Sequence, residues 1–173
     1  MKKIILLSFV NLLFSNQFNF NLEKSYITYT GMHPFHTWDG TSKDFTVDIK
    51  NHNNQLIIFV SVQLNSFDSK NENRDSNMLF YTESLKYPYV TFISDTIKYT
   101  ELSVIKSIEG NLNFHGMEKR VNIDIQMIEN DLNLSGQCKF KIDLNEFNIE
   151  LPKLLMLPIN NIIDINSKIV IDK

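Results

Sequence analysis

Strict alternation of apolar and polar residues is the feature that most constrains the fold of this chain. The segments VNIDIQM at 121–127 and CKFKIDL at 138–144 place an apolar side chain at every second position, with polar or charged residues between them. This period of two is typical of strands with one buried face and one face in water. Strands of a parallel sheet covered on both faces would read as continuous apolar runs. The pattern therefore predicts an antiparallel sheet.

Weaker alternation extends this prediction along the rest of the chain, at 26–30, 45–49, 56–64, 90–94, 108–114 and 163–171. Turn-rich segments separate these strands, at 31–40, 51–54, 116–119 and 129–131. About eight or nine short strands in 173 residues predict one all-β domain, either a sandwich or a closed barrel. In 56–64, Ile57 and Phe59 blur the alternation, so the inward face of that strand is left open.

One segment departs from the β pattern. Residues 74–85 have no alternation, and Met78, Leu79 and Tyr81 recur at helical spacing. Asn73 or Asp75 is the expected cap, and Pro88 ends anything helical before the next strand. A short helix over about 74–85 is therefore predicted between two strands.

The N-terminus has the features of an export signal. Lys2 and Lys3 precede an apolar run from Ile4 to Phe14, which is shorter than the roughly 20 residues needed to cross a bilayer. Residues 1–16 are therefore predicted to be a signal peptide and 17–173 the domain, with no transmembrane anchor; the alternative is a buried first strand or core helix. The single cysteine, Cys138, excludes an internal disulfide and is expected to be a buried structural thiol.

Several classes of function find no support in the residues. A net charge of −3 and the absence of a basic run argue against a nucleic-acid partner. None of the common nucleophile, phosphate-binding or zinc motifs is present, so no catalytic residue, cofactor or metal is predicted. His33 and His36 are three residues apart, a spacing that could bind a metal on a helix. Pro34 lies between them and favours a loop, so we expect a loop that covers the mouth of a barrel instead of a metal site.

The aromatic residues carry more weight. The chain has 13 Phe and 6 Tyr. The interior of an eight-stranded barrel is just wide enough to be packed by such side chains or to hold one small ligand. The residues alone leave both readings open.

Several motifs, taken together, resemble a known family. They are SFDSKNENRDSNM at 66–78, KYPYVTFIS at 86–94, GNLNFHGMEKRV at 110–121, TGMHPFHTWDG at 30–40, and FNIELP with LLMLP between 147 and 158. Their order and spacing resemble the YceI family of exported, polyisoprenoid-binding, lipocalin-like proteins. Three positions depart from the family's pattern: Asn77 replaces a usual His, Arg120 replaces a frequent Pro, and residues 38–40 replace a small-residue strand.

The resemblance implies an eight-stranded antiparallel barrel with a helix after strand four, in a periplasmic or secreted bacterial protein. It implies a polyisoprenoid or other long-chain lipid inside, for carriage or sequestration. The apolar lining expected from alternation and family position is Phe45, Phe59, Val60, Val62, Phe67, Met78, Leu79, Tyr81, Phe92, Leu112, Phe114, Phe140, Ile142 and Phe147. A polar mouth is expected from His33, His36, Arg74 and Asp75.

Two other readings are kept. One is a packed barrel that serves as an interaction module without ligand. The other, which is not expected, is an enzyme acting on the lipid with His33 or His36 as base. A homodimer is a further expectation.

Overall fold

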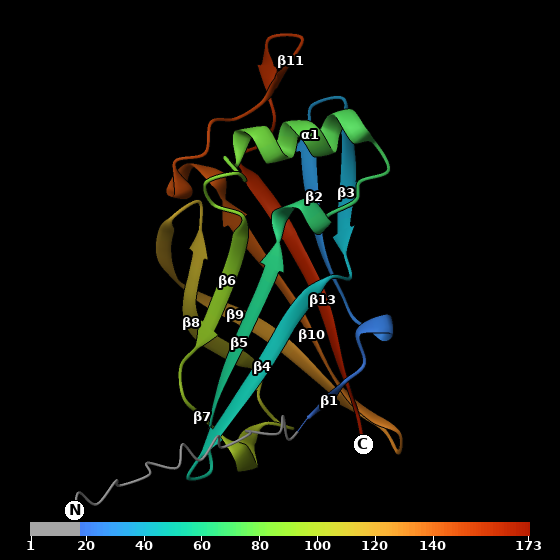
Figure 1. Cartoon of the computed structure of the whole chain (residues 1–173), viewed down its shortest axis with the longest axis vertical. Coiled ribbons are helices and arrows are strands. Elements are labelled where there is room, and N and C mark those ends of the chain that lie inside the picture. Colours follow the sequence, from blue (N-terminus) through green and yellow to red (C-terminus); the bar gives the residue numbers. More distant parts are fainter. Residues whose placement is uncertain (1–17) are drawn as a thin grey trace, which may run out of the picture.

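The computed structural model describes residues 18–173, so the predicted signal segment at 1–16 lies outside the described residues. Its main feature is one large antiparallel sheet with the strand order β3-β2-β13-β10-β9-β8-β6-β5-β4 (Figure 1). The strands on this path are β2 (Tyr26–His33), β3 (His36–Ser42), β4 (Phe45–His52), β5 (Gln55–Gln63), β6 (Tyr89–Ser94), β8 (Ser107–Phe114), β9 (Met117–Glu129), β10 (Asn133–Asp143) and β13 (Ile162–Asp172). The all-β prediction is confirmed, with nine strands on the path where eight were expected.

Shorter elements complete the chain. Two short strands pair with the sheet off its main path, and a separate hairpin has two more: β1 (Asn19–Phe20), β7 (Ile97–Lys98), β11 (Lys153–Leu154) and β12 (Leu157–Pro158). The helical elements are α1 (Glu72–Tyr81) and the 3₁₀ turns η1 (Leu22–Lys24), η2 (Leu64–Ser66), η3 (Tyr99–Glu101) and η4 (Leu144–Phe147).

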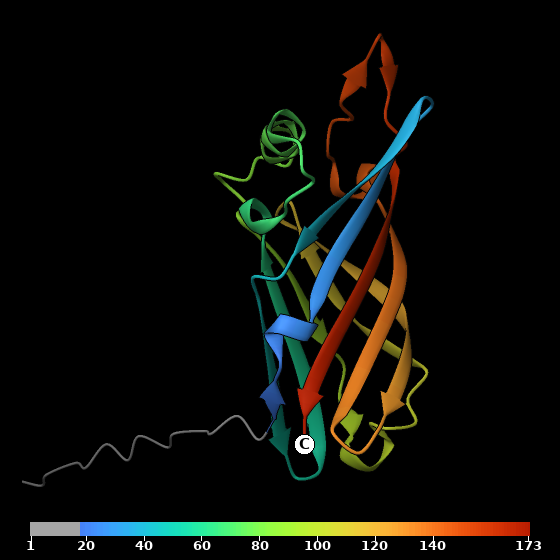
Figure 2. The same cartoon turned by 90° about the vertical axis from the view of Figure 1, so that its right-hand side faces the viewer.

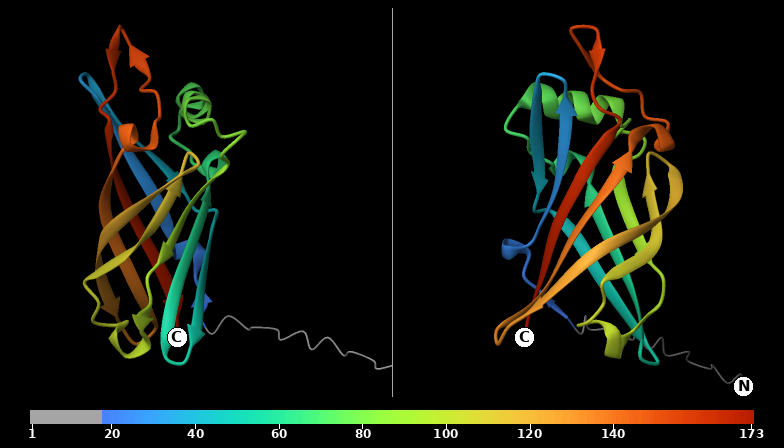
Figure 3. Two further views of the ribbon diagram at one scale, coloured as in Figure 1. Left: turned by 90° about the vertical axis from the view of Figure 1, so that its left-hand side faces the viewer. Right: turned by 180° about the vertical axis from the view of Figure 1, so that it is seen from behind.

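The sheet curls so that its two edge strands, β3 and β4, come near each other (Figures 2 and 3). An isolated bridge pairs Thr41 with Asp68, and the hydroxyls of Ser42 and Ser66 are 2.7 Å apart. Within residues 18–173, no strand ladder joins β3 directly to β4. Full hydrogen-bonded closure of the barrel therefore stays a prediction, while the curvature itself places the inner faces of the strands opposite one another.

The hairpin formed by β2 and β3 corrects one expectation. Residues 31–40 were predicted to be turn-rich, but only Pro34 and Phe35 form the turn. The glycines at the two ends of this segment lie under aromatic rings: a Cβ on Gly31 would be 2.4 Å from the Trp38 ring, and one on Gly40 would be 2.3 Å from the Tyr29 ring. Glycine is required here because an aromatic side chain of the paired strand covers it.

Helix α1 is shorter than predicted and begins earlier. Its cap is Asn71, whose side-chain oxygen accepts a hydrogen bond from the Arg74 backbone N–H at 3.1 Å, and not Asn73 or Asp75. The helix ends at Tyr81, where the Thr82 hydroxyl donates to the Met78 carbonyl at 2.7 Å. None of the side chains of α1 is buried. The helix lies across one end of the curled sheet (Figures 1 and 2).

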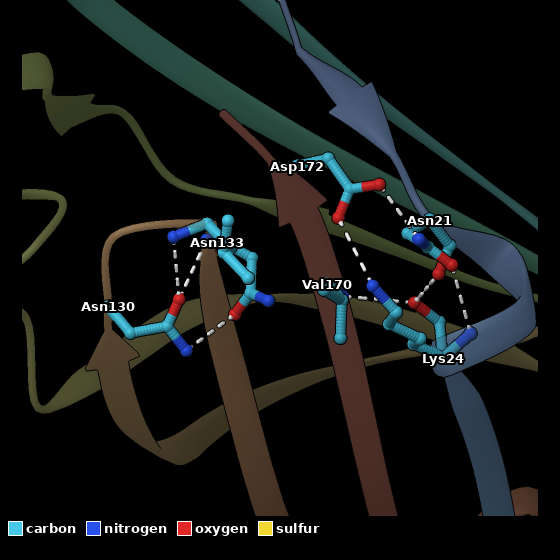
Figure 4. A network of polar contacts seen from close by, with 8 residues as sticks. Asn21, Lys24, Asn130, Asn133, Val170 and Asp172 are labelled. Carbon is cyan, nitrogen blue, oxygen red and sulfur yellow. Dashed lines mark hydrogen bonds and ion pairs between the residues drawn. The ribbon is translucent and has the colours of Figure 1, made fainter.

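The opposite end, called the far end below, holds the C-terminus and the turn between β9 and β10. There, Asn21 donates to the Asp172 carboxylate at 2.8 Å, and the Val170 N–H donates to the Ser25 hydroxyl at 2.9 Å (Figure 4). The Asn130 side chain accepts from two backbone N–H groups of the β9–β10 turn, which shapes that turn. The contacts of Asn21 and Ser25 therefore hold the segment between β1 and β2 against β13.

Candidate functional site

A cavity of about 540 Å³ runs inside the curled sheet. Its wall takes side chains from both ends of the molecule, from Phe20 and Ile171 at the far end to Met78 and Tyr81 on α1. Most of the wall is aliphatic or aromatic, because the strands turn their apolar positions inward. The alternation recognised in the sequence produces this directly: Ile123, Ile125 and Met127 of β9 lie on the wall, as do Cys138, Phe140 and Ile142 of β10.

Ten of the expected lining residues lie on the cavity wall. They are Val60, Val62, Phe67, Met78, Tyr81, Phe92, Leu112, Phe114, Phe140 and Ile142. In β5, the structure resolves the face that the sequence left open: Ile58, Val60 and Val62 point inward. The role of these residues in binding a ligand stays a prediction.

Four expected lining residues lie elsewhere. Phe59 is on the opposite face of β5 from Val60, and Leu79 packs against a core cluster instead of facing the cavity. Phe147 is buried in η4 against Phe114, with ring centroids 5.5 Å apart. Phe45 is also buried, and it borders a smaller hollow with Phe18, Phe20 and Leu22. Alternation and family position thus placed four residues on the wall that the structure places elsewhere.

Sequence reasoning missed much of the wall that β13 supplies. The alternation at 163–171 was recognised as a strand, yet its inward residues were not named as lining. These residues are Ile163, Ile165, Ser167, Ile169 and Ile171. Their period of two was a sufficient signal, because alternate residues of a strand share one face. In the structure β13 pairs with β2 and β10 along the path and with β1 off it.

The cavity opens at the α1 end. Only a few residues of its wall are themselves solvent-exposed, and they are His36, Asn71, Asn73, Asn77, Lys153 and Leu154. All of them come from the start of β3, from α1 and its cap, or from the β11–β12 hairpin. These elements surround the α1 end, called the mouth below, whereas the wall residues of the far end are buried or half-buried. A ligand inside would therefore communicate with solvent through the mouth.

Arg74 is the main charged group of the mouth. Its guanidinium lies over the Trp38 ring, 5.4 Å from the centroid, and Nη1 donates to the Ser69 carbonyl at 3.4 Å. Among the described residues it has no ion pair with a carboxylate. Asp75, expected beside it at the mouth, is not on the wall; its carboxylate accepts from the Ser69 N–H at 3.2 Å and so shapes the turn before α1.

His33 lies on the wall but uses both ring nitrogens in structural contacts. Nδ1 accepts from the Phe35 N–H at 3.4 Å, and Nε2 lies 3.3 Å from the Leu157 carbonyl oxygen, which accepts from the ring N–H. The side chain is only 3% exposed. His33 therefore joins the β2–β3 hairpin to the β11–β12 hairpin, and only His36 keeps an exposed imidazole at the mouth.

Tyr29 contributes a second polar atom to the wall. Its hydroxyl is buried and has no hydrogen-bond partner within the described part of the chain. Burial raises the pKa of Tyr29 to about 12, and the negative charge of Asp75 adds to this effect, while an interaction with the Trp38 side chain and the positive charge of Arg74 offset part of the rise. The hydroxyl is therefore a protonated donor over the whole physiological range and is available to a polar group in the cavity.

Cys138 is half-buried on the cavity wall. Burial raises the pKa of its thiol, and an interaction with Ser167 offsets part of that rise. A thiol that stays protonated is a weak nucleophile. Over residues 18–173, no group of three His, Cys, Asp or Glu side chains is placed to hold a metal ion. In the same range, no helix is long and apolar enough to cross a membrane.

Comparison with known proteins gives a family for this fold and cavity. The model of the YceI-like domain matches residues 18–171, and the chain belongs to that family. A search of curated proteins gives no match.

Solved structures share the fold at low sequence identity. Burkholderia cenocepacia BcnA is 17% identical with a TM-score of 0.74, over 88% of this chain and 99% of that one. A polyisoprenoid binding domain from Saccharophagus degradans, implicated in plant cell wall breakdown, is 12% identical with a TM-score of 0.74, over 91% of this chain and 99% of that one. A Campylobacter jejuni YceI protein is 17% identical with a TM-score of 0.58, over 78% and 84% of the two chains.

Proposed function

We propose that this protein holds a polyisoprenoid or another long-chain amphiphile inside its cavity, for carriage or sequestration and without catalysis. The observation that carries the proposal is the continuous apolar wall from the far end to the mouth. Its volume of about 540 Å³ falls within the roughly 300–1,000 Å³ that small-molecule sites occupy. A packed interaction module would have no such internal space. The shared fold of the polyisoprenoid binding domain from Saccharophagus degradans supports the same ligand class.

The wall supplies enough affinity without a charged anchor. Transfer of each CH₂ group from water to an apolar site is worth about 0.8 kcal/mol, so a long tail offsets the loss of its own freedom on binding. Such binding has weak chemical specificity, because aliphatic walls distinguish length and width better than identity. Tails of similar length are therefore expected to compete.

The polar groups orient the ligand. Arg74 at the mouth and the Tyr29 hydroxyl beneath it are the groups that a head group would meet, with the tail toward the far end. Asn77, at the position where the family usually has His, offers an exposed amide in place of an imidazole. His33 is a poor general base in this arrangement, because both of its ring nitrogens are already engaged.

Export belongs to the same proposal. A signal-like N-terminus fits a periplasmic or secreted protein, in which a lipid needs shielding from water between membranes. N-terminal sequencing of the mature protein tests this directly: a start near residue 17 supports export, and an intact Met1 contradicts it. The homodimer stays a prediction, to be tested by sedimentation velocity.

The direct test of the ligand is extraction. Protein purified without detergent is extracted with organic solvent, and the extract is analysed by mass spectrometry. A long-chain lipid in stoichiometric amount is expected. A clean extract from such protein contradicts the proposal and favours an interaction module without ligand.

A further inference from the structure

The β11–β12 hairpin exposes four consecutive apolar residues. Leu154, Leu155, Met156 and Leu157 are 48%, 75%, 92% and 42% exposed. These four residues are called the apolar tip. Single exposed apolar side chains are ordinary on a protein surface, but runs of this length are costly unless they serve a function.

The backbone conformation of the β11–β12 turn does not explain why Leu155 and Met156 occupy it. Leu155 and Met156 have φ values of 51° and 68°, in the left-handed region. Two other two-residue turns of this chain have the same geometry, and they use Asn53 with Asn54 (51° and 64°) and His115 with Gly116 (53° and 72°). Asn and Gly are the residues that such hairpin turns favour. The apolar pair at 155–156 is therefore held against the local preference.

The apolar tip projects at the mouth. The β11–β12 hairpin extends beyond α1, on the same end of the molecule as the turn between β2 and β3 (Figures 1 and 2). Contacts hold these two hairpins together: the Asn160 N–H donates to the Met32 carbonyl at 2.8 Å, and His33 reaches the Leu157 carbonyl. Phe35, 66% exposed, lies in the β2–β3 turn. The β2–β3 hairpin thus adds an aromatic side chain to the projection that the two hairpins form at the mouth, called the prominence below.

The prominence is continuous with the cavity. Pro152, Lys153, Leu154 and Ile159, at the base and on the sides of the β11–β12 hairpin, are part of the cavity wall. Leu154, which belongs to both the apolar tip and the cavity wall, therefore connects the tip with the interior. No comparable connection leads from the single exposed apolar residue Leu132 in the far-end turn, which is not on the wall.

We propose that the apolar tip, with Phe35, inserts into the interfacial layer of a lipid bilayer and places the mouth against the membrane. Two paired residues on each side of the turn give the hairpin a height of about 7 Å, which matches the roughly 5–10 Å depth of interfacial insertion. Lys153, exposed at the base of the hairpin, is placed to meet lipid phosphates while the apolar residues enter the acyl boundary. A narrow convex turn is poorly suited to a stable protein interface, which buries about 800 Å² on each partner.

Membrane docking does not depend on the proposed function; only the transfer of a lipid between the bilayer and the cavity rests on it. The docking itself is tested by flotation with phosphatidylcholine vesicles. The key variant is the double substitution Leu155→Asn with Met156→Gly, because it gives the turn the residues that its geometry favours. The variant is therefore expected to fold at least as stably as the parent.

The parent protein is expected to float with the vesicles, and the double variant is expected to bind at least about tenfold more weakly. Leu132→Asn is the matched control, since Leu132 is 76% exposed, as much as Leu155, but lies at the far end. The control is expected to float like the parent. A parent protein that stays unbound, or a double variant that floats equally well, overturns the proposal. The proposal is also overturned if the parent protein is a dimer in sedimentation velocity, the double variant is a monomer, and neither binds vesicles.

A second readout separates this proposal from the proposed function. The double variant, given a long-chain isoprenoid diluted from organic solvent, is expected to bind it as the parent does. It is expected to take up the same lipid from vesicles at least about tenfold more slowly. If the parent protein floats with vesicles but never contains a bound lipid, the docking proposal is supported and the ligand proposal is contradicted. Protein that holds lipid and takes it up from vesicles without the apolar tip removes the docking proposal alone.

Discussion

The two ends of the curled sheet differ in what their side chains do. At the far end, Leu56 is fully buried and Val170 is 2% exposed, and polar side chains bond the first and last strands together. At the mouth, α1 has no buried side chain. Within residues 18–173, Arg74 has no carboxylate partner and the Tyr29 hydroxyl has no hydrogen bond of normal geometry.

This difference indicates that the two ends of the cavity have different roles. The far end contributes packing that stabilises the fold, whereas the mouth has the polar and exposed groups that the proposed ligand and membrane would meet. Regions with few buried contacts open locally at lower free energy than the core does. Residues at the two ends should therefore respond differently to substitution, and the following predictions use that contrast.

The largest effect is expected in the packed core. Leu56→Ala removes a fully buried side chain and should lower the free energy of unfolding by about 2–5 kcal/mol. Met78→Ala on α1 is the partner experiment, since Met78 is half-buried and faces the cavity; it should cost about 1 kcal/mol or less. Urea denaturation of both variants measures the difference. Equal losses would mean that the mouth is packed as tightly as the far end.

The next effect concerns the buried Tyr29 hydroxyl and alkaline pH. Because its pKa rises to about 12 in the folded protein, while an unfolded tyrosine ionises near pH 10, the unfolded state loses its proton first. The stability contribution of Tyr29 is constant below about pH 10 and then falls by about 2–3 kcal/mol as the pH approaches 12.

Tyr29→Phe should therefore lose less stability than the parent between about pH 10 and 12, with little change at neutral pH, where an unpaired hydroxyl gives no stabilisation. Tyr99→Phe, at an exposed tyrosine of the far end, serves as the control and should follow the parent. Identical alkaline slopes for Tyr29→Phe and the parent would show that the hydroxyl is not buried as described.

A smaller effect is expected at the cap of α1. Asn71→Ala removes the hydrogen bond to the Arg74 N–H and should destabilise the helix by about 1 kcal/mol. Since α1 is not part of the core, hydrogen exchange should speed up in 72–81 and stay unchanged in β10. Faster exchange throughout the sheet would contradict the independence of the mouth from the far end.

The alternation at 121–127 and 138–144 was enough to predict antiparallel strands and their inward faces, because each side chain of a strand must choose one side of the sheet. The order of the motifs was enough to predict the family, which the domain match confirms. Both signals are local or depend on order along the chain.

The rest depends on contacts between distant residues. Segment 31–40 was predicted to be turn-rich, and only the rings of Trp38 and Tyr29 explain why Gly31 and Gly40 belong to strands. Phe45 and Phe147 were expected to line the cavity, but their side chains are buried against other segments. The exposure of the apolar tip also could not be predicted, since an apolar run in a sequence reads first as core.

The central claim is that the interior is a cavity that holds a lipid, and one measurement tests it most directly. Cys138→Phe places a ring in the cavity, and Lys139→Phe places the same ring on the outer face of the same strand. Native mass spectrometry of detergent-free protein should show a bound long-chain lipid for the parent and for Lys139→Phe, and its loss for Cys138→Phe with about 1 kcal/mol or less of destabilisation. If the parent carries no lipid and Cys138→Phe is destabilised by the roughly 1–3 kcal/mol of an overpacked core, the claim is contradicted.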